Sequence, residues 1–221
     1  MGTMITIRRA ILVIALANVS GQTANGAARE PSRMKTVLVL GDSLSEGFRL
    51  SPRNAWPMLL SQRLRQIDPN FRIVNSSASG GTTEGGLRRL PAHLNRKIDI
   101  FVVELGINDA FSGIPVERIR DNLQTIIDKV RARNPDVLIV VVGMQFPIVT
   151  NDDYVTTFGK MFGELAQENH AALVPYLLEG VAGDPALNLE DRIHPNAAGH
   201  KILADTVWRT LEPLVREVAA K

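Results

Sequence analysis

Apolar and polar positions from Lys35 onward alternate between two kinds of segment. Short runs that are almost wholly apolar predict strands buried on both faces, as in a parallel sheet covered by helices. Longer segments repeat apolar residues every three or four positions, the period of an amphipathic helix. The predicted strands are Thr36–Leu40, Phe71–Val74, Ile98–Leu105, Val137–Val142 and Ala172–Val174. The predicted helices are Asn54–Ile67, Thr82–Leu94 (kinked or broken at Pro91), Val116–Val130, Tyr154–Gln167 and Ala197–Val218.

Five strands separated by helices predict an α/β fold, a three-layer α/β/α sandwich with right-handed crossovers. We expect a flavodoxin-like, five-stranded parallel sheet in the order 2-1-3-4-5, which binds ligands at the carboxyl ends of its strands. Three polar motifs directly follow predicted strands, namely Gly41–Ser43, Asn75–Thr83 and Gly106–Asp109. These motifs are therefore predicted to meet at one rim of the sheet.

A serine, a histidine and an aspartate in these positions suggest hydrolysis of an acyl bond. Ser43 follows a buried strand and Gly41, which allows a sharp turn toward the rim. Asp191 lies three residues before His194, so in a turn its carboxylate can hold the ring Nδ1–H and leave Nε2 to deprotonate Ser43. Each piece alone is also typical of an ordinary turn or helix cap, so the hypothesis depends on their combination.

Four blocks of this sequence, in order, resemble the motifs of the GDSL, or SGNH, hydrolase family. Gly41–Ser45 reads Gly-Asp-Ser-Leu-Ser like the first block, and Asn75–Thr83 is similar to the second. Gly106–Asp109 is similar to the Gly-x-Asn-Asp third block, and Asp191–His194 to the Asp-x-x-His last block. The resemblance covers about residues 34–218. Within the family, the sequence most resembles the bacterial thioesterase I, protease I and lysophospholipase group, which includes arylesterases.

The resemblance implies the SGNH hydrolase fold and a set of site residues. Ser43 would be the nucleophile of a triad with His194 and Asp191, and the oxyanion hole would consist of Ser43, Gly80 and Asn108. The implied enzyme is a serine esterase that hydrolyses carboxylic esters, and also thioesters or lysophospholipids, of short to medium acyl chains. It needs no cofactor and no metal ion.

Two other functions compete with this hypothesis. The family also includes carbohydrate acetylesterases, but only 5% of the residues are aromatic, which leaves few side chains for stacking sugars. A non-catalytic flavodoxin-like binding module would have no need to keep the five predicted site residues together.

Two loops at the rim are predicted to frame the acyl chain. They contain Phe111, Ile114, Phe146 and Pro147, and each follows the carboxyl end of a central strand. The alternative is that these side chains cap the core beneath the loops. The segment 144–154 departs from the loop usual in the resembled group, so acyl-chain preference is not carried over.

Composition narrows the range of partners. The chain of 221 residues has no cysteine, which excludes a thiolate nucleophile and cysteine-ligated metals. Four of the 25 basic residues and one of the 23 acidic ones lie in residues 1–33, which leaves 21 and 22 in the rest. That balance argues against nucleic-acid binding, so the expected partner is a small ester or acyl substrate. The composition does not indicate an oligomeric state.

Residues 1–33 are predicted to be a signal peptide or leader that precedes a hydrolase domain, residues 34–221. Arg8 and Arg9 come before an apolar run, residues 10–19, and small residues follow. The run is far shorter than the roughly 20 residues that span a bilayer, so no transmembrane segment is expected. The enzyme would be periplasmic or secreted; if Met34 is the true start, it would be cytoplasmic.

Several polar residues are predicted to have no direct part in the chemistry. Asp42 and Asp109 should brace their loops by hydrogen bonds. The histidines at 93, 170 and 200 lack ligand spacing and are predicted to lie at the surface.

Overall fold

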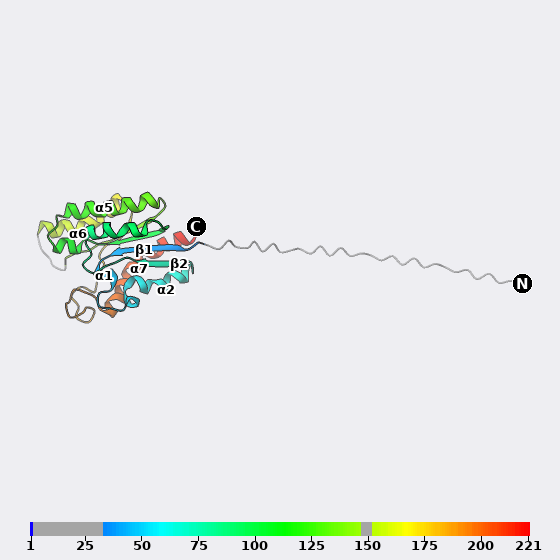
Figure 1. Ribbon diagram of the computed structural model, residues 1–221. Coiled ribbons are helices and arrows are strands. Elements are labelled where there is room, and N and C mark those ends of the chain that lie inside the picture. The colour runs from blue at the N-terminus through cyan, green and yellow to red at the C-terminus, as the bar shows by residue number, and fades with distance from the viewer. Residues whose placement is uncertain (2–32, 147–151) are drawn as a thin grey trace. The chain divides into compact units, whose positions relative to one another are not determined.

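Five strands form one parallel sheet in the computed structural model, which describes Met1, residues 33–146 and residues 152–221. The order along the sheet is β2-β1-β3-β4-β5 (Figure 1), which confirms the predicted topology. The strands are β1 (Lys35–Gly41), β2 (Phe71–Asn75), β3 (Ile100–Glu104), β4 (Leu138–Val142) and β5 (Ala172–Val174). The predicted leader and Pro147 lie in parts of the chain outside this description, so both remain predictions.

Helices cover both faces of the sheet. The helices are α1 (Ser43–Glu46), α2 (Trp56–Ile67), α3 (Thr83–Arg89), α4 (Ile107–Phe111), α5 (Val116–Arg133), α6 (Asp153–Glu168) and α7 (Ala197–Ala219). The two short 3-10 helices are η1 (Pro52–Asn54) and η2 (Leu90–His93). Helix α2 packs against α7 on one face, and α5 packs between α3 and α6 on the other (Figure 1). The result is the predicted α/β/α sandwich.

The core lies between the sheet and these helices. Every residue of β1 and β3 is buried, as their apolar runs predict. Helix α2 buries Trp56, Leu60 and Leu64, which recur every four residues on one face. Because both central strands are fixed on both sides, the loops at their carboxyl ends start from rigid positions.

Helices α1 and α4 were not predicted from the sequence. They contain four and five residues, too short for a helical period to be visible. Both follow central strands almost directly, so each carries one of the predicted polar motifs. Pro91 acts as expected, because α3 ends at Arg89 and only a 3-10 helix continues through it.

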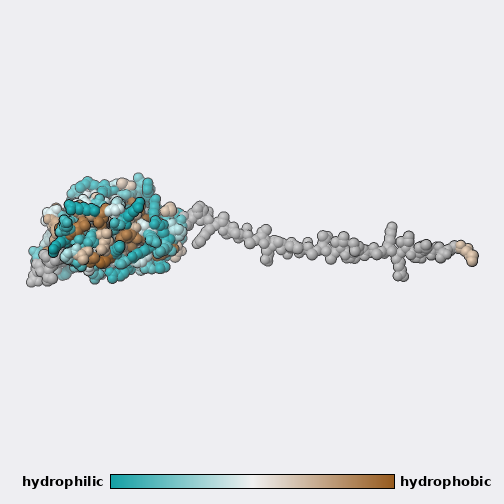
Figure 2. Space-filling view, turned by 90° about the horizontal axis from the view of Figure 1, so that it is seen from below, coloured by the Kyte–Doolittle hydropathy of each residue, from teal (hydrophilic) through white to brown (hydrophobic). Residues whose placement is uncertain are grey.

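The surface combines hydrophilic and hydrophobic residues on the side of α2 and α7 (Figure 2). Among residues 33–146 and 152–221, the large hydrophobic side chains that are exposed are Met34, Met58, Phe111 and Ile193. Within the same residues no helix has the length and apolar character needed to cross a membrane.

Candidate active site

Ser43 is the first residue of α1 and directly follows the end of β1. The Asp42 carboxylate caps this helix, because its Oδ1 accepts a hydrogen bond of 2.9 Å from the backbone N–H of Leu44. Gly47 ends the helix with φ +86°, in the left-handed region that glycine adopts without strain. The Ser43 side chain is therefore held in a short, tightly bounded turn at the rim.

His194 connects Ser43 to Asp191. Its Nε2 lies 3.0 Å from Ser43 Oγ, and its Nδ1 lies 2.8 Å from Asp191 Oδ2. The other carboxylate oxygen, Oδ1, accepts the backbone N–H groups of Ile193 at 2.9 Å and His194 at 3.0 Å. Desolvation raises the pKa of Asp191, but these hydrogen bonds outweigh it and lower the pKa to about 2. Asp191 is thus an anion at neutral pH and fixes the imidazole.

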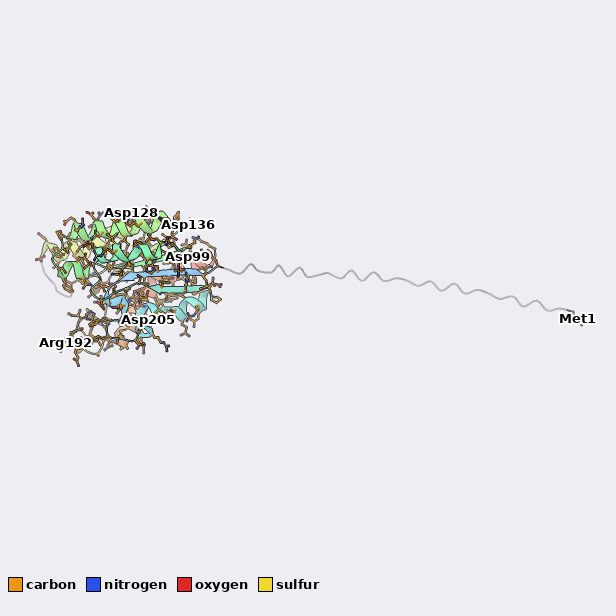
Figure 3. The ribbon with its side chains drawn as sticks, in the orientation of Figure 1. Met1, Asp99, Asp128, Asp136, Arg192 and Asp205 are labelled. Atoms are coloured by element: carbon orange, nitrogen blue, oxygen red, sulfur yellow. The ribbon has the colours of Figure 1, made fainter. Side chains whose placement is uncertain are left out.

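The turn that carries this pair has an unusual backbone. Arg192 lies between the two residues with φ +57°, in the left-handed region. Figure 3 shows Arg192 on the loop that joins β5 to α7, at one end of the described domain. This conformation lets Asp191 face the two backbone N–H groups that follow it.

An aromatic residue that the sequence did not single out supports His194. The Phe48 ring lies with its centroid 4.3 Å from the His194 ring, tilted by 37°. The Arg49 guanidinium lies 5.0 Å from the centroid of Phe48 on the loop after α1. Phe48 sits in an irregular segment, so no periodicity could have pointed to it.

Gly80 lies in the loop after β2, with φ +70°. A Cβ at this position would meet no atom of the other described residues within 4 Å, so the left-handed backbone, and not crowding, favours glycine. Glu46 of α1 holds the loop, because its Oε2 accepts the backbone N–H of Ser79 at 2.7 Å and also the Ser79 hydroxyl. The loop is thereby tied to the helix that carries Ser43.

Asn108 is the second residue of α4, and its amide links two loops of the rim. Its Nδ2 donates to Asp42 Oδ2 at 3.1 Å and to the carbonyl of Gly81 at 3.0 Å. Asp42 precedes Ser43 and Gly81 follows Gly80. The structure therefore brings Asn108 to the neighbours of both other predicted oxyanion residues, with an acceptor for each amide hydrogen. Asp109 braces α3 as expected, accepting from the Thr83 N–H and hydroxyl at 2.8 and 2.6 Å.

A buried polar network lies behind Ser43. Ser45 Oγ donates to Glu104 Oε2 at 2.6 Å and accepts from Trp56 Nε1 at 3.2 Å. The backbone N–H of Trp56 donates to Nδ1 of His200 at 3.2 Å. None of these contacts was predicted, because their partners lie far apart in the sequence.

His200 corrects one prediction. It was expected at the surface, yet its side chain is only 1% exposed. Burial lowers its pKa to about 4, so it is neutral where it accepts the Trp56 N–H. The sequence did hold a signal, because His200 continues the buried stripe of α7 formed by Leu203, Ala204 and Val207.

A cavity of about 310 Å³ opens beside Ser43 and His194. Its lining combines Ser43, Asn108 and His194 with mainly apolar side chains. The other lining residues are Leu44, Ile107, Phe111, Met144, Gln145, Leu178, Ala182, Gly183, Arg192 and Ile193. A larger hollow of about 730 Å³, which Arg33, Asp99 and Arg133 help to line, contains none of the predicted site residues.

The four residues predicted to frame the acyl chain have different positions. Phe111 lines the cavity and is 61% exposed. Phe146 is not among the lining residues; its ring packs between Phe111, at 5.5 Å, and Phe158, at 5.3 Å between centroids. Ile114 packs against the core and also lies outside the lining. Pro147 is not described. In the part of the chain that the structure describes, no three His, Asp or Glu side chains are grouped to hold a metal ion.

The hydrogen bonds that join Ser43, His194 and Asp191 have the arrangement found in serine hydrolases. Residues 39–202 match the model of the GDSL-like Lipase/Acylhydrolase family, so the chain belongs to this family and is a carboxylic ester hydrolase. The resemblance of the four sequence blocks is confirmed.

Similar proteins with assigned names match most of the chain. It is 39% identical over 182 residues to esterase TesA of Pseudomonas aeruginosa, covering 82% of this chain and 90% of that protein. It is 36% identical over 181 residues to thioesterase 1/protease 1/lysophospholipase L1 of Escherichia coli, covering 81% and 85%. The crystal structure of TesA superimposes with a TM-score of 0.76 at 38% identity, covering 81% of this chain and 99% of that one.

Proposed function

We propose that the chain is a serine esterase that hydrolyses carboxylic esters, and also thioesters or lysophospholipids, of short to medium acyl chains. The observation that carries this proposal is the line of hydrogen bonds from Ser43 Oγ through His194 to Asp191, at 3.0 and 2.8 Å. Names of the relatives agree with it, since they include an esterase, a thioesterase and an arylesterase.

The proposed reaction has two halves. Ser43 Oγ attacks the ester carbonyl while His194 Nε2 takes its proton, and Asp191 stabilises the imidazolium that forms. The oxyanion accepts hydrogen bonds from the backbone N–H groups of Ser43 and Gly80 and from the Asn108 amide, one hydrogen of which leaves the Gly81 carbonyl for the oxyanion. His194 then gives the proton to the leaving alcohol or thiol. A water molecule, deprotonated by the same nitrogen, cleaves the acyl-enzyme, and the proton returns to Ser43.

The cavity limits the size of the acyl group. Ligand sites typically span about 300–1,000 Å³, so a cavity of about 310 Å³ is small and favours short to medium chains. A carbohydrate acetylesterase is the second candidate. It has less support here, because Phe111 and His194 are the only ring-bearing side chains in the described lining, which offers little surface for a sugar.

The proposed function is tested with p-nitrophenyl esters from acetate to laurate, an acyl thioester and an acetylated sugar. We expect the highest kcat/KM on esters or thioesters of short to medium chains. Turnover confined to the acetylated sugar would favour the second candidate, and no turnover on any of them would contradict an esterase.

Activity is expected to rise with pH through neutrality, because His194 must be neutral to accept the Ser43 proton. Histidine is the side chain that ordinarily changes charge between about pH 5 and 8. Asp191 cannot cause this rise, because its pKa is about 2 and it is already ionised at higher pH. The measurement is kcat/KM on an activated ester; a profile that stays flat from about pH 5 to about pH 9 would exclude a histidine base.

Phe146→Ala is expected to shift the chain-length optimum toward longer esters. Removing the ring leaves a space behind Phe111, which lines the cavity, and each further buried methylene gains about 0.8 kcal/mol. The measurement is kcat/KM from acetate to laurate. Phe71→Leu, at a buried position on β2, controls for lost stability. An unchanged profile with a lower Tm would show that Phe146 serves only the core.

A further inference from the structure

Glu104 is a fully buried acid that the proposed reaction does not use. It ends β3 with 0% exposure. Its Oε2 accepts the Ser45 hydroxyl at 2.6 Å and the backbone N–H of Asp42 at 3.2 Å. Its Oε1 is buried and accepts no hydrogen bond from any residue that the structure describes. An ionised carboxylate would leave a charged oxygen without any partner in the interior, which is costly.

A second buried acid lies beside it. The Asp42 side chain is also 0% exposed and is hydrogen bonded to the Glu104 side chain. Within residues 33–146 and 152–221, no cation forms an ion pair with either carboxyl group; Nη2 of Arg89 donates instead to the carbonyl of Gly41, at 2.8 Å. Two adjacent buried carboxyl groups without a paired cation cannot both be ionised at low cost.

The hydrogen bonds indicate which of the two holds the proton. Asp42 accepts from the Leu44 N–H through Oδ1 and from the Asn108 amide through Oδ2, so both of its oxygens behave as carboxylate oxygens. Glu104 has one oxygen with donors and one without. A proton on Oε1 would give this oxygen a hydrogen to donate, and the neighbouring Asp42 side chain is the acceptor that such a proton needs.

We propose that Glu104 is a positioning residue: it stays protonated at neutral pH and donates that proton to Asp42, whose carboxylate caps the helix of Ser43 and orients the Asn108 amide. The inference rests on the proposed role of Asn108 in the reaction. The shared proton also limits the charge beside the oxyanion to one, because a second negative charge there would oppose the developing oxyanion.

The surrounding groups are consistent with a neutral Glu104. Burial raises the pKa of Glu104 well above its ordinary value, and the neighbouring Asp42 charge raises it further. Burial also raises the pKa of Asp42, to about 7, while its hydrogen bonds to Leu44 and Glu104 and the charge of Arg89 lower it. The charge of Asp109 of α4 raises it. On the far side of Ser45 and Trp56, His200 of α7 is neutral. His194 contacts Ser43 and is not among the groups that shift the pKa of Asp42 or Glu104.

The decisive comparison is between Glu104→Gln and Glu104→Met. Glutamine retains an oxygen that accepts from the Ser45 hydroxyl and the Asp42 backbone N–H. Its NH₂ group is a permanent donor toward the Asp42 carboxylate, and it cannot ionise. Methionine supplies neither group. We expect Glu104→Met to lower kcat by roughly tenfold to a hundredfold through misplacement of Asn108, with a smaller change in KM. Glu104→Gln should restore most of kcat and keep it at alkaline pH, where the wild type declines.

Two direct readouts accompany the kinetics. The infrared spectrum at neutral pH should contain the carbonyl stretch of a protonated carboxylic acid in the wild type, and Glu104→Gln should lack it. The urea midpoint of the wild type should fall, relative to that of Glu104→Gln, as pH rises above about 4.3. The sign follows because the unfolded chain loses the Glu104 proton there while the folded chain keeps it.

Asp99→Asn is the matched control. Asp99 is a buried carboxyl directly before β3, where it accepts the Thr36 N–H at 2.8 Å. Figure 3 shows it at the end of the domain away from Arg192. This variant should lose stability and keep the wild-type kcat and infrared band. A band that survives in Glu104→Gln, or a loss of kcat there equal to that of Glu104→Met, would overturn the inference. In both of these outcomes the wild type still hydrolyses esters. They therefore differ from a failure of the proposed function, in which the wild type would hydrolyse none.

Discussion

Replacing Ser43 by alanine is expected to lower kcat for ester hydrolysis by about 10⁴- to 10⁶-fold, because nucleophile and base act as a unit. The residual rate would come from the oxyanion donors and from substrate binding alone. Stability should change little. Within the described residues the one hydrogen bond of Ser43 Oγ is with His194, and such a bond contributes about 1 kcal/mol. The measurement is kcat on a p-nitrophenyl ester together with the Tm of both proteins.

Ser61→Ala provides the control for this experiment. Ser61 is a buried serine of α2 whose hydroxyl has no hydrogen-bond partner in residues 33–146 and 152–221, so its loss should leave kcat at the wild-type value. If Ser43→Ala kept more than about a tenth of the wild-type rate, the nucleophile would have to be another residue. A complete loss of activity with a collapsed Tm would show that the substitution had unfolded the rim instead.

The fold was predictable because each element carries a strong period. β5 has the predicted bounds, and the other strands differ by at most two residues at either end. A strand that is apolar on both faces, such as β3, is buried on both faces when helices cover the sheet on each side. The positions of Ser43, Asp191 and His194 were predictable for another reason. Their spacing and order along the chain are preserved in four short blocks, and the sheet topology brings those blocks to one rim.

The buried network was not predictable from the same patterns. Glu104 appears in the sequence as the polar end of an apolar strand, and its contact with Ser45 joins residues 59 positions apart. The Trp56–His200 contact spans 144 positions. Hydrophobic periodicity reports which face of an element is buried, but it does not report which polar groups meet there.

The cavity lining was only partly predicted, for a related reason. Phe111 was expected in it, but Leu178, Ala182 and Ile193 were not. These three residues come from the irregular segment between β5 and α7, where no period marks an inward face. Phe146 instead supports Phe111 from behind, so a loop hydrophobe proved to be a neighbour of the cavity and not part of its described wall.

Asn108→Ala is expected to lower kcat by about 10²- to 10³-fold, or about 2.7–4 kcal/mol, because one donor to the oxyanion is lost. KM should change much less, since the negative charge on the carbonyl oxygen develops only in the transition state. Part of the loss has a second origin. The same amide donates to Asp42 and to the Gly81 carbonyl, so its removal also loosens the connection between the two loops.

Asn134→Ala separates these two contributions. Asn134 is a buried amide near the amino ends of the strands, where its Oδ1 accepts the Ile98 N–H at 2.8 Å and its Nδ2 donates to Val130. Replacing Asn134 should lower Tm about as much as Asn108→Ala does, because each variant loses one side-chain amide and its hydrogen bonds, while kcat stays near the wild-type value. If Asn108→Ala raised KM and left kcat unchanged, the amide would act in substrate binding. The oxyanion would then depend on the backbone N–H groups of Ser43 and Gly80 alone.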